Sequence, residues 1–275
     1  MQIIDGFQCY DQELANSNDD FESRCFPVYQ KYIPVNFWYK GRNKIINLFL
    51  NKFRSSSHKT FLEIGCGNGF TLKYLKKKNL RINFKGCDIY IQALQYAKIN
   101  NDSDIELFQY NLFKKNLTSQ YDVIGCFDVL EHIKEDEKAI ENIYELLSPG
   151  GICIITVPSD MNLWSNNDII NKHKRRYSKK ELTKKIEAAQ FELLYMNHFV
   201  FFLYPILFIK AKLQGKIKSE KELEGKELSS LLNLEIPKPV NFLFGILMQI
   251  EYVLVKIGFK FPWGSSLICV LRKNS

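Results

Sequence analysis

Three glycines at alternate positions, Gly65, Gly67 and Gly69, follow the apolar run 60–64 and precede a helix-like stretch. Glycine lets such a turn be tight and lets a ligand approach the bare backbone. A glycine-rich turn between a strand and a helix commonly cradles part of a nucleotide. A dinucleotide fingerprint would need its third glycine at position 70, where this chain has Phe70. The spacing therefore argues against a dehydrogenase.

Two acidic residues accompany this turn. Glu63 lies two residues before the first glycine, where a negative charge would repel a pyrophosphate but would suit an ammonium or sulfonium group. Asp88 ends the next apolar run, and a carboxylate there can accept hydrogen bonds from both hydroxyls of a ribose. Together the two acids predict a nucleoside site whose ligand carries a positive charge.

A basic segment at 171–185, NKHKRRYSKKELTKK, contains eight Lys or Arg residues. Ser178 and Glu181 have the S-x-x-E spacing of a capping box, so a helix is expected to begin near 179. The preceding loop would then lie over the carboxyl edge of the sheet, where open α/β folds bind ligands.

Four residues of that loop carry functional hypotheses. We consider His173 and Tyr177 as catalytic bases, and Arg175 and Arg176 as contacts to an anionic acceptor. The alternative interpretation is a solvated, basic helix start. A second acceptor-side cluster lies in YIPVNFWYKGRN near the N-terminus and comprises Trp38, Tyr39 and Arg42. It is either a cap folded over the ligand or aromatic packing of a leading helix on the core.

The elements that must position these residues follow from periodicity. Strand–helix alternation implies a doubly wound α/β sheet with helices on both faces. We expect a Rossmann-like sheet of about seven strands. The predicted strands are 60–64, 82–87, 105–109, 121–127, 152–157 and a hairpin of 191–197 with 266–272; the predicted helices include 42–53, 70–78, 90–99 and 135–147. The expected divisions are a helical N-terminal cap (1–58), a core (59–198), an apolar helical insertion (199–260) and a final strand (261–275).

The insertion at 199–260 is the least ordinary part of the chain. Its first apolar run, 199–209, is shorter than the about 20 residues that a membrane span needs. The charged stretch 210–235 is expected to be a mobile excursion. In 240–259 a stripe runs along one side: Leu243, Leu247, Ile250, Leu254 and Ile257. Since Glu251 and Lys256 interrupt this run, we expect a lid, a dimer interface or a peripheral membrane contact rather than a membrane span.

Composition limits the kinds of partner, metal site and cellular location that the protein can have. The 275 residues carry a net charge of +8, which would suit nucleic acid, an acidic membrane or a phosphorylated substrate. Seven cysteines are spread singly without C-x-x-C spacing, which argues against a zinc ribbon or a disulfide framework. No metal site is expected. The start MQIIDGFQCYDQEL lacks the pattern of a signal peptide, so we expect a cytoplasmic protein, either free or peripheral to a membrane.

Four motifs in order resemble the class I S-adenosylmethionine-dependent methyltransferases. They are LEIGCGNG (62–69), GCDI (86–89), YDVIGCFDVLEHI (121–133) and LLSPGGICIITVP (146–158). The resemblance is to the type 11/23-like branch that includes quinone-biosynthesis methyltransferases. One departure is Asn111, where many relatives have an Asp near the adenine.

The resemblance implies S-adenosyl-L-methionine as cofactor and S-adenosyl-L-homocysteine as product. The implied cofactor-binding residues are Glu63, Gly65, Cys66, Gly67, Gly69, Asp88, Ile89, Asn111, Leu112, Phe127 and Asp128. In this interpretation the glycines line the methionine and ribose, Asp88 takes the ribose hydroxyls and Ile89 packs on adenine. His132, after the fourth strand, is expected to order the backbone.

Three functions are consistent with these residues. The first is in-line methyl transfer to a small-molecule or lipid-like acceptor, with the apolar insertion roofing the pocket. The second is an RNA methyltransferase, which the positive charge suggests, although no RNA-binding module is recognisable. The third is a non-catalytic cofactor-binding regulator or scaffold. The acceptor atom, the pathway and the oligomeric state are not predicted.

Overall fold

The computed structural model describes residues 2–16, 21–101, 104–114, 116–213, 229, 232 and 234–274. Its centre is one mixed sheet in the order β1-β2-β5-β4-β3-β6-β7-β9-β8. The strands are β1 (Gln2–Ile4), β2 (Phe7–Cys9), β3 (Thr60–Ile64), β4 (Asn83–Asp88), β5 (Glu106–Gln109), β6 (Tyr121–Phe127), β7 (Leu147–Pro158), β8 (Glu192–Phe199) and β9 (Ser266–Arg272). The α/β fold class and the strands predicted from 60 onwards are confirmed.

The parallel part of the sheet sets the position of the site. From β3 the chain adds β4 and β5 on one side, then returns to add β6 and β7 on the other. Strands that are covered by helices on both faces are apolar throughout, and β7 is buried from Gly151 to Pro158. The order reverses beside β3, and ligands bind outside the carboxyl ends of the strands at such a point.

Both edges of the sheet are antiparallel. At one edge β9 lies between β7 and β8, so the predicted hairpin of the last two core strands is confirmed. At the other edge β2 pairs parallel to β5, and β1 pairs antiparallel to β2. The prediction of a helical N-terminal segment is therefore wrong, and the sheet has nine strands within the described residues rather than about seven. Strands β1 and β2 have three residues each, which is too short to show an apolar periodicity in the sequence. Their place in the sheet depends on the pairing of β2 with β5, which the sequence pattern does not reveal.

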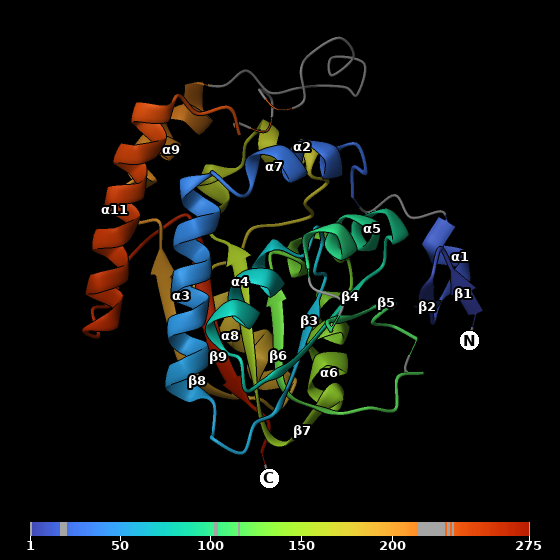
Figure 1. Ribbon diagram of the computed structural model, residues 1–275. Helices are drawn as coiled ribbons and strands as arrows, with labels where there is room; N and C mark the ends of the chain where they lie inside the picture. Colours follow the sequence, from blue (N-terminus) through green and yellow to red (C-terminus); the bar gives the residue numbers. More distant parts are fainter. Residues whose placement is uncertain are drawn as a thin grey trace.

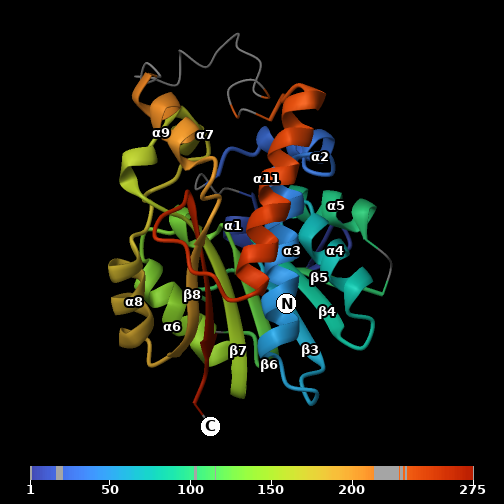
Figure 2. The same ribbon diagram turned by 90° about the vertical axis from the view of Figure 1, so that its left-hand side faces the viewer.

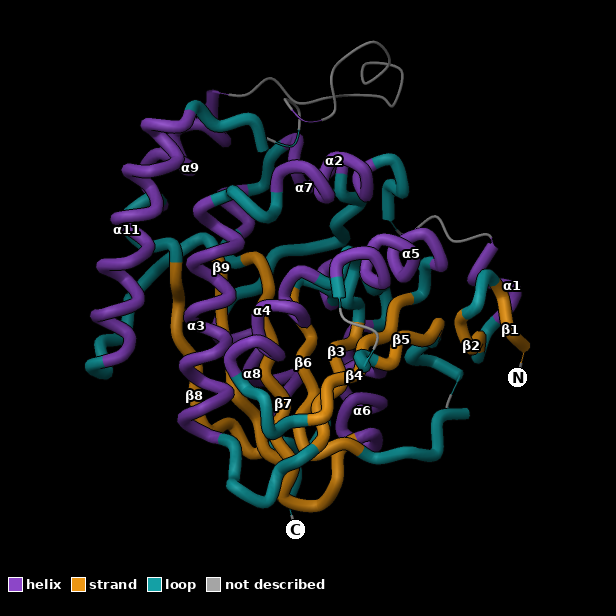
Figure 3. The backbone as a smooth tube through the Cα atoms, viewed as in Figure 1, coloured by secondary structure: helices purple, strands orange, loops and turns teal. Residues whose placement is uncertain are grey.

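Helices cover both faces of the sheet (Figures 1 and 3). One face packs against α6 (Asp136–Leu146) and α8 (Lys179–Ala188) through Ile140, Ile143, Leu182 and Ile186. The opposite face packs against α3 (Phe37–Phe53) and α4 (Phe70–Lys78). Next to them α5 (Ile91–Asn100) covers the glycine turn and β2. The short α1 (Gln12–Asn16), α2 (Cys25–Tyr32) and α7 (Asn166–Ile170) complete the helical layer.

The insertion forms α9 (Tyr204–Leu213) and α11 (Lys238–Lys256), and α11 lies along the outer side of α3 (Figures 1 and 2). The buried side of α11 holds Met248, Glu251 and Val255. Of the predicted stripe, Leu243, Ile250 and Ile257 are exposed, whereas Leu247 and Leu254 are half-buried and pack against the core. The charged excursion predicted at 210–235 lies mostly outside the described residues.

The orientation of α11 has a local cause. The carboxylate of Glu251 accepts the N–H of Val200 at 2.6 Å and the N–H of Phe202 at 2.9 Å, directly after β8. Because a buried backbone N–H without a partner is costly, these bonds hold Glu251 inside. Among the described helices, α11 is the one long and apolar enough to cross a membrane by length and composition, and 17% of its apolar window is buried.

Candidate functional site

One cavity of about 1210 Å³ lies at the carboxyl ends of the parallel strands. It is larger than the usual range for a single ligand, so it has room for a cofactor and an acceptor together. All eleven residues that the sequence assigns to the cofactor line it: Glu63, Gly65, Cys66, Gly67, Gly69, Asp88, Ile89, Asn111, Leu112, Phe127 and Asp128. The chain thus brings together residues from four strand ends, and their roles toward a cofactor remain predictions.

The turn between β3 and α4 presents bare backbone to this cavity. Gly65, Gly67 and Gly69 have φ angles of 68°, 51° and 73°, a left-handed conformation that side chains disfavour. A Cβ atom at Gly67 would meet nothing within 4 Å, so this glycine faces open space. A Cβ at Gly65 would lie 2.4 Å from the Val129 side chain. The turn therefore combines a tight fit to the protein with an open side for a ligand.

Asp88 fixes the end of β4 to this turn. Its carboxylate accepts the N–H of Gly67 at 2.8 Å and the N–H of Tyr90 at 3.0 Å. Each carboxylate oxygen can accept a further bond, so both hydroxyls of a ribose have acceptors there. Burial raises the pKa of Asp88 to about 6, while the backbone donors oppose that rise.

Glu63 is 3% exposed, and its Oε2 has no hydrogen-bond partner among the described residues. Burial raises the pKa of this carboxyl to about 8, against the opposing charge of Arg42. A buried carboxylate without a partner is costly unless a ligand satisfies it. The site fits a ligand with a cationic group, as the amino group of S-adenosylmethionine would provide.

Arg42 and Asp128 form an internal pair beside this cavity. The Arg42 guanidinium donates to the carboxylate of Asp128 and, at 2.7 Å, to the hydroxyl of Thr71. It also lies 5.0 Å from the ring centre of Trp38. These contacts engage Arg42 within the protein and do not support its predicted role toward the acceptor. They indicate that Arg42 holds Asp128 in its left-handed conformation (φ 56°) at the end of β6.

The side chain of Asn111 is also engaged within the protein. Its amide nitrogen donates to Asp11 at 2.7 Å, and its oxygen accepts the N–H of Phe113 at 3.0 Å. The expectation that this amide would read the adenine edge is therefore not supported in this arrangement. Asn111 instead connects the N-terminal segment to the loop after β5.

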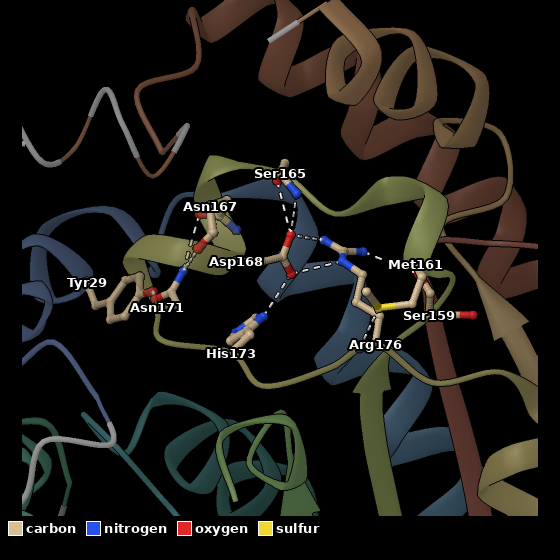
Figure 4. A network of polar contacts seen from close by, with 9 residues as sticks. All are labelled: Tyr29, Ser159, Met161, Ser165, Asn167, Asp168, Asn171, His173 and Arg176. Atoms are coloured by element: carbon tan, nitrogen blue, oxygen red, sulfur yellow. Dashed lines mark hydrogen bonds and ion pairs between the residues drawn. The ribbon is translucent and has the colours of Figure 1, made fainter. Parts of the chain in front are cut away.

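The second half of the cavity is organised by Asp168 on α7 (Figure 4). This buried carboxylate accepts from His173 Nδ1 at 2.9 Å and from Arg176 Nε at 2.9 Å. It also accepts the N–H of Ser165 at 2.8 Å. Burial alone would raise its pKa, but the bond from His173 and the charge of Arg176 outweigh burial and lower it to about 2.

His173 and Arg176 therefore line the cavity as predicted, although Arg176 is committed to Asp168. Two other predictions do not fit. Tyr177 is fully buried away from the cavity, where its hydroxyl donates to Asp136 at 2.8 Å, and burial holds its pKa far above the ordinary value. Arg175 also pairs with Asp136, at 2.6 Å. Both residues fasten the loop to α6 through Asp136, its first residue.

The sequence interpretation missed several residues that line the cavity or hold its lining side chains. Asp168 was detectable, because Ser165 and Asp168 have the same S-x-x-acid spacing that marked Ser178. Glu131 was also missed as a site residue; burial and the nearby charge of Asp128 raise its pKa. Aromatic side chains from the N-terminal segment gave no signal, since their approach depends on tertiary packing: Phe21, Phe26 and Tyr29.

Apolar side chains from the insertion wall this second half. They are Val200, Leu203, Ile206, Leu207, Leu232, Leu234 and Phe244. Trp38 and Tyr39 of α3 line it as well, their rings meeting edge to face at 4.7 Å. The cavity is thus polar and backbone-rich beside the glycine turn, and largely apolar below α9 and α11.

The chain is similar in sequence to methyltransferases. Residues 37–195, which are 159 of the 275, match the family described as Methyltransferase domain. A ubiquinone biosynthesis O-methyltransferase of Hydrogenovibrio crunogenus is 28% identical over 108 residues, covering 38% of this chain. The matched region spans only 44% of that relative's own length.

Solved structures agree on the fold. A chain in the complex between the Haloferax volcanii Trm112 methyltransferase activator and a methyltransferase has a TM-score of 0.60 at 14% identity, covering 92% of this chain and 96% of that chain. Haemonchus contortus phosphoethanolamine N-methyltransferase 2, solved with S-adenosyl-L-methionine, has a TM-score of 0.54 at 12% identity, covering 85% and 53%. This chain belongs to the methyltransferase-domain family and has the class I S-adenosylmethionine-dependent methyltransferase fold.

Proposed function

We propose that this protein transfers a methyl group from S-adenosyl-L-methionine to a small, lipid-like acceptor. The observation that carries the proposal is one cavity with two unlike halves, a charged half at the glycine turn and an apolar half below the insertion. When bound, the cofactor supplies a methyl group on a sulfonium sulfur, whose positive charge is lost as the acceptor takes that methyl.

The charged half has a residue for each part of the cofactor. Asp88 would accept the ribose hydroxyls, and Glu63 would meet the amino group with its unsatisfied oxygen. Gly67 leaves the space in which the methionine portion would lie against the backbone. Support for this cofactor also comes from the phosphoethanolamine N-methyltransferase solved with S-adenosyl-L-methionine.

The apolar half indicates the class of acceptor. Its walls come from the insertion and from α3, and its polar groups gather around His173. An acceptor with an apolar body and one polar reacting group would match this distribution. The ubiquinone biosynthesis O-methyltransferase is a relative whose name implies such a substrate. Since the donor is already activated, the protein mainly has to align the acceptor and exclude water.

We further propose that α11 rests on a membrane surface, at the cytoplasmic side. Six exposed apolar residues recur on one side of it: Phe242, Leu243, Ile246, Ile250, Val253 and Ile257. We call this set the α11 outer face. Lys238 and Lys256 stand at its two ends, and the one acid within α11, Glu251, is buried. Apolar residues between lysines suit an interface with anionic lipid.

The proposed activity can be tested by filling the apolar half. With S-adenosyl-L-methionine carrying a labelled methyl group, we expect transfer to a prenylated phenol. Leu207→Trp should reduce that transfer at least tenfold because the indole occupies acceptor space, while S-adenosylhomocysteine still binds. Leu80→Trp, at a site 83% exposed and outside the cavity, is the matched control. Equal activity of the two variants would refute this placement of the acceptor.

A further inference from the structure

Three side chains in the acceptor half offer metal-ligating atoms that lie close together. They are Glu131, His132 and His173, and the ligand atoms all lie within 4.8 Å of one another. Glu131 and His132 come from the turn after β6, whereas His173 comes from the loop after α7. All three line the same cavity. Two imidazoles and one carboxylate form a donor set that suits a divalent transition-metal ion.

The surroundings of His173 match those of a metal ligand. Its Nδ1 donates to Asp168, so its Nε2 carries the lone pair in the neutral ring. A ligating histidine commonly gives its other N–H to a carboxylate, which fixes the tautomer and the ring orientation. Asp168 is itself held by Arg176 and Ser165 and is fully buried. The ring edge left to coordinate is therefore fixed by a rigid network (Figure 4).

Glu131 provides a second, independent observation. It is 1% exposed, and its Oε2 has no hydrogen-bond partner among the described residues. The two nearest acids each have a cation already, since Arg42 pairs with Asp128 and Arg176 pairs with Asp168. A buried carboxylate oxygen with no such partner indicates a missing cation. The ring of His132 meets that of His173 edge to face at 4.7 Å, which brings both imidazoles to this carboxylate.

We propose that Glu131, His132 and His173 bind one divalent transition-metal ion at the acceptor end of the cavity. Three protein ligands leave coordination positions open, as in catalytic rather than structural sites. A hydroxyl of the acceptor would take an open position, and the charge of the ion would lower the pKa of that hydroxyl so that its proton passes to water. The oxygen is then ready to accept the methyl group. The location of the ion is independent of the proposed function, and only this role of the ion rests on it.

Metal binding is measured directly on the full chain. After chelation and dialysis, the protein is titrated with Co²⁺ and Zn²⁺, and bound metal is counted by mass spectrometry. We expect one ion per chain and a visible Co²⁺ spectrum that excess Zn²⁺ removes. His173→Ala and Glu131→Gln should each weaken binding at least tenfold. Asp168→Asn should weaken it roughly tenfold to a hundredfold, because the histidine loses its orienting carboxylate. His58→Ala, on the loop before β3, is the matched control and should bind normally.

Cofactor binding, measured in parallel, separates the two proposals. S-adenosylhomocysteine should bind to the chelated protein and to both ligand variants, since its site lies at the glycine turn. Bound metal that the three variants retain would overturn the metal site. Chelated protein that keeps full methyl transfer would overturn the role of the ion and leave His173 as a metal-free base. Loss of cofactor binding in the chelated wild type would count against the proposed arrangement of the two halves.

Discussion

At the scale of single residues, two buried carboxylates control the charged half of the cavity. Burial disfavours the ionised form of Glu63 unless a cation binds beside it, whereas backbone N–H donors partly stabilise the ionised form of Asp88. The same burial that makes Glu63 costly in the empty protein makes it selective for a cationic ligand, because little solvent screens the attraction.

This difference gives a pH dependence with a definite sign. Burial raises the pKa of Glu63 to about 8, so at pH 7 the free protein holds this carboxyl mostly protonated. A bound amino group favours the ionised form, so binding releases a proton. Affinity for S-adenosylhomocysteine should therefore rise, by up to about tenfold per unit, as pH increases from 6.5 to 8. Calorimetry in two buffers with different ionisation heats measures the proton released.

Substitutions distinguish the contributions of Glu63 and Asp88 to cofactor binding. Glu63→Gln should flatten the pH profile, while Asp88→Ala should weaken binding at all pH values by roughly 1–3 kcal/mol through lost ribose hydrogen bonds. The exposed Glu187→Ala is the control. A pH-independent dissociation constant of the unmodified protein would refute the assignment of Glu63.

At the scale of elements, the insertion contributes surfaces of two kinds. Its inner side walls the acceptor half, and the α11 outer face points to solvent. Helix α11 buries its one acid, Glu251, together with Met248 and Val255, and leaves other apolar residues exposed. Its orientation is fixed by the bonds of Glu251 to the backbone after β8 and by this apolar packing.

The membrane proposal is tested at this scale. The triple variant Phe242→Ser, Leu243→Ser, Ile246→Ser should reduce sedimentation with phosphatidylglycerol-containing vesicles at least tenfold, since it removes apolar contact area. Leu80→Ser with Ile99→Ser, also exposed but on other elements, should bind like the unmodified protein. No sedimentation of the unmodified chain, together with a dimer by light scattering that the triple variant abolishes, would identify the α11 outer face as a dimer interface.

The sequence predicted those elements whose signal is local. The strand 60–64, the helix 70–78 and the start of a helix at Ser178 all match the structure, because apolar periodicity and capping act over a few residues. The orientation of α11 was not predictable, since it depends on backbone donors about fifty positions away from Glu251. The same holds for Tyr177, whose spacing next to His173 suggested chemistry but whose hydroxyl is held by Asp136.

At the scale of the whole molecule, the fold places the charged half of the cavity, its apolar half and the insertion next to one another in that order. The charged half of the cavity lies at the switch point beside β3. The apolar half, which contains Glu131, His132 and His173, adjoins it and is bounded by the insertion. The arrangement in space connects residues from both ends of the chain, since the N-terminal aromatics and the insertion line the same cavity. This ordering suits the proposed transfer of a methyl group to a lipid-like acceptor.

The central claim is that the crevice beside β3 holds S-adenosylmethionine. Thermal unfolding in the presence of S-adenosylhomocysteine and, separately, of NAD tests it most directly. Because a ligand that binds only the folded state stabilises it by mass action, S-adenosylhomocysteine at one hundred times its dissociation constant should add about 2.7 kcal/mol and raise the melting temperature, and NAD should leave it unchanged. A rise with NAD and none with S-adenosylhomocysteine would contradict the account.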